Sequence, residues 1–73
     1  MTNSLAVLDH TGDTRIEWDP DEPDEVAAAR AMFDNLQDKR YLAYRVTGRD
    51  REQIRKFDPS AAKIVMSPQL VGG

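Results

Sequence analysis

A chain of 73 residues without a cysteine has to be held together by its hydrophobic core, because neither a disulfide bond nor a cysteine-ligated zinc ion can reinforce it. A chain of this length buries only about 60% of the surface that its unfolded form exposes. The length therefore predicts one small domain. The lack of cysteine also excludes a cysteine nucleophile, and His10 is the only histidine, so a site that needs several histidines cannot form within the chain.

Turn-forming residues between two strand-like segments predict a β-hairpin at the start of the chain. Residues 5–8 are all apolar, and residues 14–18 alternate between polar and apolar side chains. The residues between them include Gly12, and a glycine provides the positive φ angle that a tight strand connection needs. Ile16 and Trp18 lie on one face of the second strand, so that face is expected to be buried.

An amphipathic helix is predicted over residues 22–37. Arg30 and Asp34 stand four residues apart on its polar side, which predicts an ion pair between them. The apolar side chains repeat with the helical period and form one stripe, made of Val26, Ala29, Met32, Phe33 and Leu36.

The acidic segment before this helix is expected to have a structural role. Residues 19–25 hold five acids and two prolines. Pro23 suits a first helical turn, Asp21 is the expected N-cap and Asp24 its capping-box partner. Because acids also favour the positive end of the helix dipole, capping and solvation explain them without catalysis. A calcium loop starting at Asp19 would need glycine at its sixth position, where Asp24 stands, so that loop is excluded.

The second half of the chain predicts further strands. Residues 41–47 are rich in aromatic and β-branched side chains, and Leu42, Tyr44 and Val46 share the face that we expect to be buried. The remaining elements follow in order: a break at residues 48–51, a weaker strand at 53–57, a turn at 58–61, a last strand at 62–66 and a stop at Pro68.

These elements have the order β-β-α-β-β-β and predict an α+β fold, a two-layer sandwich in which one helix covers a mostly antiparallel sheet. We expect one domain over residues 1–67 and a flexible tail over residues 68–73. The predicted core consists of Leu5, Val7, Ile16, Trp18, Val26, Ala29, Phe33, Leu36, Leu42, Tyr44, Val46, Ile64 and Met66.

Charge is distributed unevenly along the chain, whose net charge is −3. Residues 9–38 hold ten acids against two bases, whereas residues 39–56 hold seven bases against two acids. The two halves can balance each other within the fold, or each can face a different partner. The net acidic charge argues against a nucleic-acid partner. The candidate residues for binding a protein partner are Arg45, Arg49, Arg51, Arg55 and Leu70, with Trp18, Tyr41 and Tyr44 as candidate aromatic contacts.

The chain offers few residues for catalysis. Its glycines, at positions 12, 48, 72 and 73, do not form a phosphate-binding loop, and His10 lies beside a predicted turn, where we expect it to be exposed. We therefore expect a protein without enzymatic activity, cofactor or bound metal. The sequence predicts neither a membrane span nor a signal peptide, so the expected location is the cytoplasm.

The last two residues, Gly72 and Gly73, form a tail without side chains. Together with a first hairpin over residues 5–18, a helix that follows an acidic proline-containing linker, and further strands, this ending resembles the ubiquitin-like β-grasp family. The resemblance spans nearly the whole chain and rests on the order of elements and on the terminal dipeptide.

The resemblance implies a small carrier or modifier. In that family an adenylating enzyme activates the C-terminal glycine carboxylate, which then passes to a lysine through a thioester or becomes a thiocarboxylate for sulfur transfer. By resemblance Gly73 carries the activated carboxylate and Gly72 is its necessary neighbour. Val71 precedes them, where eukaryotic members often have arginine and sulfur carriers accept other residues, so modifier and carrier both remain open.

The alternative is a non-catalytic binding or structural subunit of a larger assembly, for instance of a phage. Such a subunit would use its divided charge and its aromatic side chains to contact neighbours. In both interpretations the partners are proteins, and the chain is expected to be a monomer unless it belongs to an assembly.

Overall fold

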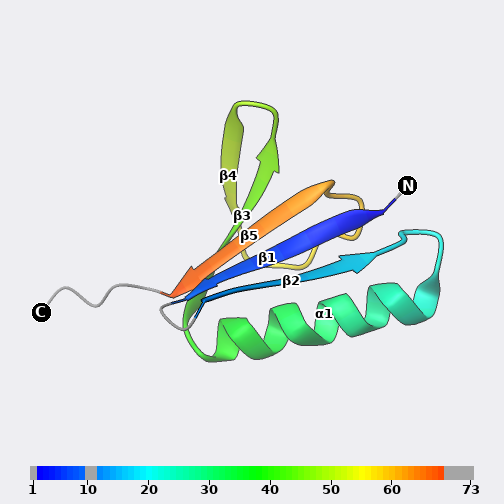
Figure 1. Ribbon diagram of the computed structural model, residues 1–73, viewed down its shortest axis with the longest axis horizontal. Coiled ribbons are helices and arrows are strands. Elements are labelled where there is room, and N and C mark those ends of the chain that lie inside the picture. The colour runs from blue at the N-terminus through cyan, green and yellow to red at the C-terminus, as the bar shows by residue number, and fades with distance from the viewer. Residues whose placement is uncertain (1, 10–11, 69–73) are drawn as a thin grey trace, which may run out of the picture.

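The computed structural model describes residues 2–9 and 12–68 (Figure 1). Within them the backbone forms the predicted order of elements, and the α+β fold is confirmed. The elements are β1 (Asn3–Asp9), β2 (Gly12–Trp18), α1 (Pro23–Asp38), β3 (Tyr41–Thr47), β4 (Asp50–Ile54) and β5 (Lys63–Pro68).

The strands form one sheet in the order β2-β1-β5-β3-β4. Neighbouring strands are antiparallel except β1 and β5, which are parallel, so the last strand lies in the middle of the sheet beside the first. The helix α1 lies along one face of this sheet and contacts β2 and β3 (Figure 1). We call the face that α1 covers the inner face and the opposite one the outer face.

The helix begins one residue later than predicted, and its N-cap is Glu22, not Asp21. Glu22 has extended backbone angles, because the proline at position 23 disfavours a helical conformation in the residue before it. No side chain caps the helix. The capping box with Asp24 is therefore wrong. Instead the carboxylate of Glu25 accepts a hydrogen bond from the backbone N–H of Asp19 at 2.9 Å.

The helix ends at Asp38, and three backbone hydrogen bonds close its last turn, one of them from the N–H of Lys39 to the carbonyl of Asn35 at 3.3 Å. The N–H of Lys39 donates to the carbonyl of Leu36 at 3.0 Å, and the N–H of Arg40 donates to the carbonyl of Gln37 at 2.9 Å. Arg40 has a φ angle of +68°, in the left-handed region where a helix end usually has glycine.

The core lies between α1 and the inner face of the sheet. Eight of the predicted core residues are buried, and Ile16 and Val26 are half-buried and pack against them. The buried apolar residues are Leu5, Val7, Trp18, Ala29, Phe33, Leu36, Ala43, Ala61, Ile64 and Met66.

The predicted face of β3 is wrong. Leu42, Tyr44 and Val46 are half-buried and lie on the outer face, whereas Ala43 is buried on the inner face. The register sets this orientation, because Ala43 pairs with Met66 of β5 and with Ile54 of β4. A small side chain is suited to a position between these larger neighbours and beneath the helix.

The connection from β3 to β4 is shorter than predicted. Residues 50 and 51, which we expected to break the strand, belong to β4, and residues 55–57 lie outside it. Thr47 pairs with Asp50, so only Gly48 and Arg49 form the turn. Gly48 has a φ angle of +58°, as the first turn position of a type II′ hairpin requires.

The segment between β4 and β5 closes one end of the core. The ring of Phe57 packs against those of Trp18 and Phe33, with centroids 5.1 and 5.7 Å apart. The carbonyl of Pro59 accepts hydrogen bonds from the indole N–H of Trp18 at 3.1 Å and from the side-chain amide of Asn3 at 3.0 Å. Trp18 is fully buried, so its predicted role as a partner contact is wrong.

Candidate functional site

The predicted basic binding residues do not form one surface. Arg45 lies on the inner face, opposite Ile64 and Glu52. Its guanidinium donates to the carboxylate of Asp58 at 2.8 Å and to that of Glu52 at 2.7 Å. These hydrogen bonds raise the pKa of Arg45 above its ordinary value. Arg45 therefore has its carboxylate partners within the molecule.

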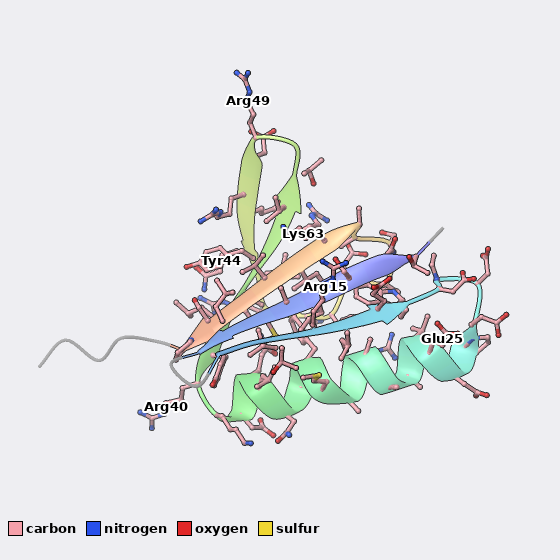
Figure 2. All side chains as sticks on the ribbon, viewed as in Figure 1. Arg15, Glu25, Arg40, Tyr44, Arg49 and Lys63 are labelled. Atoms are coloured by element: carbon pink, nitrogen blue, oxygen red, sulfur yellow. The ribbon has the colours of Figure 1, made fainter. Side chains whose placement is uncertain are left out.

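The other three predicted arginines lie in three different places. Arg49 stands at the exposed tip of the β3–β4 hairpin and points away from the rest of the molecule (Figure 2). Arg51 is exposed in β4, paired with the outer-face residue Val46. Arg55 follows β4 and lines a cleft against α1. Leu70 lies outside the described residues.

The outer face carries a band of apolar side chains, three of which we predicted to lie in the core. One row crosses all five strands, through Arg15, Ala6, Val65, Tyr44 and Gln53. Figure 2 shows Tyr44 and Lys63 on the side of the sheet away from α1. No described element covers this face. The apolar residues of the band are Ala6, Leu8, Leu42, Tyr44, Val46 and Val65.

Most of this band is half-buried by neighbouring side chains, and Leu8 is 42% exposed. Basic residues surround it: Arg15, Arg51 and Lys63 are exposed on the same face. Arg15 forms an ion pair with Glu17 at 3.5 Å. Because both side chains are exposed, this pair contributes little to stability. An apolar strip with a charged rim is the arrangement expected of a protein-binding surface.

The acidic side chains of the described residues do not gather into a metal centre. No group of three or more His, Cys, Asp or Glu side chains among these residues is placed to hold a metal ion. Asp58 has a lowered pKa, first because it accepts a hydrogen bond from the Ser60 hydroxyl and then because it pairs with Arg45. These contacts stabilise a turn, so this carboxylate has a structural role.

Gly72 and Gly73, the predicted activation residues, lie outside the described residues. The strand that precedes them in the sequence, β5, is described. β5 extends through Pro68, which pairs with Tyr41 of β3. Gly73 therefore follows the last sheet residue by five positions. A chain of five residues reaches at most about 17 Å.

Comparisons with models of protein families, with curated proteins and with solved structures found no match. Among the described residues, α1 is too short and too polar to cross a bilayer as a helix.

Proposed function

We propose that this chain is a small ubiquitin-like carrier or modifier, which other enzymes activate at the carboxylate of Gly73. The proposal rests on the fold taken together with the last two residues of the sequence. A β-β-α-β-β-β sheet-and-helix fold ends in a central strand, and Gly72-Gly73 follows that strand within five residues. The element order supports the resemblance to the β-grasp family.

Partner enzymes carry out the chemistry that the resemblance implies. In the first step an oxygen of the Gly73 carboxylate attacks the α-phosphorus of ATP, and pyrophosphate leaves. A thiolate or a sulfur donor then attacks the resulting acyl adenylate, and AMP leaves. A lysine amine can in turn displace the thiolate, which forms an isopeptide bond and releases a proton. Glycines suit this route because a side chain at either position would hinder entry into a narrow activating site.

The proposal requires that the mature protein end at Gly73, and this can be tested with matched chains. We expect protein ending at Gly73 to form covalent adducts or a thiocarboxylate when incubated with ATP and an extract of the cells that produce it. A chain lacking Gly73 and a chain extended by one alanine should both remain unmodified. Intact-mass spectrometry and fragment sequencing of the linked peptide provide the readout. Modification of all three chains, or of none, would contradict the proposal.

The outer face favours a second candidate, a non-catalytic binding subunit of a larger assembly. Its apolar band is uncovered in the described structure, as an interface between subunits would be. The two candidates respond differently to mutation. Replacing Tyr44 by serine should disrupt an assembly built on this face and leave tail modification intact. Removing Gly73 should have the opposite effect.

A further inference from the structure

A cleft of about 270 Å³ lies between α1 and the segment that follows β4. Arg30 and Asp34 line it from successive turns of the helix, and Arg55, Lys56 and Phe57 line it from the other side. Phe57 is held in place by its ring contacts with Trp18 and Phe33. The cleft wall is therefore fixed to the core, although its charged side chains are exposed.

The cleft carries three cations and one carboxylate. The ion pair that the sequence predicts between Arg30 and Asp34 is absent. Within the described residues, ion pairs form at other positions and involve none of the four charged cleft residues. A local charge of +2 thus stands on a chain whose net charge is −3.

We propose that this cleft binds an acidic segment of a partner protein, with the partner's carboxylates between Arg30, Arg55 and Lys56. Guanidinium and ammonium groups form their strongest hydrogen bonds with carboxylates and phosphates. Asp34 distinguishes between these anions. Its carboxylate can accept a hydrogen bond from a backbone N–H of a peptide, and it repels a free phosphate, which carries up to two negative charges at neutral pH, more strongly than it repels a single peptide carboxylate. This inference concerns the folded body and goes beyond the proposed chemistry of the tail.

A nucleic acid fits the cleft less well than an acidic peptide. Nucleic-acid binding uses an extended basic surface that follows many phosphates. Here the other exposed basic side chains are spread over the hairpin tip, the outer face and the C-terminal end of α1, and α1 begins in an acidic segment. Three cations gathered in one small cleft match one or two carboxylates.

The test is a titration of ¹⁵N-labelled protein with a capped hexaglutamate peptide, followed by NMR. We expect saturable shifts of the backbone amides of Arg30, Asp34, Arg55, Lys56 and Phe57, which weaken as salt increases. Inorganic phosphate at equal ionic strength should not saturate these residues. If phosphate saturates them and the peptide does not, the cleft binds a small anion and the proposal is wrong. Shifts spread evenly over Arg15, Arg49 and Lys63 would equally overturn it.

Three variants make the test specific. Lys56→Glu should weaken peptide binding by about fivefold or more, as expected for exposed charges. Asp34→Asn should strengthen it by about two- to fivefold, because the asparagine oxygen still accepts a peptide N–H while the repulsion of the peptide's carboxylates is removed. Arg49→Glu is the matched control, because it makes the same charge reversal at the hairpin tip and should leave affinity unchanged. Amide spectra show whether each variant is folded. Equal weakening by Lys56→Glu and Arg49→Glu, or no gain with Asp34→Asn, would contradict the assigned site.

Discussion

Asp58 joins two parts of the molecule through one carboxylate. It accepts hydrogen bonds from the backbone N–H of Ser60 at 3.0 Å and from the Ser60 hydroxyl at 2.6 Å. It also accepts one from Arg45 of β3 at 2.8 Å. The turn after β4 is thereby tied to β3. The aspartate turn itself was predictable from the sequence, but the distant Arg45 was not.

The lowered pKa of Asp58 predicts how stability depends on pH. The ionised carboxylate contributes fully above its unfolded pKa of about 3.9, and the contribution is lost as pH falls below this value toward the folded pKa. Asp58→Asn should therefore lower stability at pH 7 and flatten the loss of stability below about pH 4. Urea titrations of both proteins at pH 7, 4 and 3 measure this. Parallel losses of stability in both proteins would show that Asp58 is not responsible.

Arg40 has an unfavourable backbone conformation that glycine would relieve. Its φ angle of +68° follows the helix C-cap, where left-handed geometry costs a residue with a side chain about 1 kcal/mol. Part of the stability gained by removing this strain is offset by the greater conformational freedom of glycine in the unfolded chain. We expect Arg40→Gly to stabilise the protein by about 0.5–1 kcal/mol in a denaturant titration. A destabilised variant would show that the Arg40 side chain makes a contribution larger than this strain.

At the scale of whole elements, the helix was largely predictable and β3 was not. The stripe of α1 identifies its buried face, because only one side of that helix is apolar. In contrast, β3 has apolar or aromatic side chains on both faces: Tyr41 and Ala43 lie on the inner face, and Leu42, Tyr44 and Val46 lie on the outer face. The size and β-propensity of Leu42, Tyr44 and Val46 led to the prediction that these three side chains are buried. The pairing of Ala43 with Met66 and Ile54, which decides the orientation, depends on strands distant in sequence.

One substitution made on both faces tests this orientation of the sheet. Ala43→Leu should destabilise the protein by about 1–3 kcal/mol, because the buried site has no room for the added atoms. Ala6→Leu adds the same atoms on the outer face and should change stability by about 0.5 kcal/mol or less. Thermal and urea unfolding of the two variants measure the difference. Equal effects would mean that β3 has the opposite orientation.

The contact between α1 and the sheet depends most on Phe33. Its side chain is fully buried and its ring lies 5.7 Å from that of Phe57. Phe33→Ala should cost about 3–5 kcal/mol, a large share of the stability of a small domain. Ala28→Ser, on the exposed side of the same helix, is the control and should have little effect. A loss below about 1 kcal/mol for Phe33→Ala in a urea titration would show that α1 packs through another face.

At the scale of the whole molecule, the uneven charge of the sequence does not separate into two opposed surfaces. One of the basic residues, Arg45, forms ion pairs within the molecule, whereas Arg49 and Arg51 lie on the hairpin and Arg55 lines the cleft. The cleft could not be predicted, because it joins helix residues to a segment more than twenty positions away. The resemblance that suggests a carrier depends on element order, which local patterns do predict.

We propose that Gly73 is the reactive end of a carrier or modifier. The most direct measurement is mass spectrometry of the N-terminally tagged protein, purified under denaturing conditions from the cells that naturally produce it. We expect a mature chain that ends at Gly73, with a fraction linked through that residue to a lysine or ending in a thiocarboxylate. A chain that continues beyond Gly73, or one whose Gly73 carboxylate is always free, would contradict it.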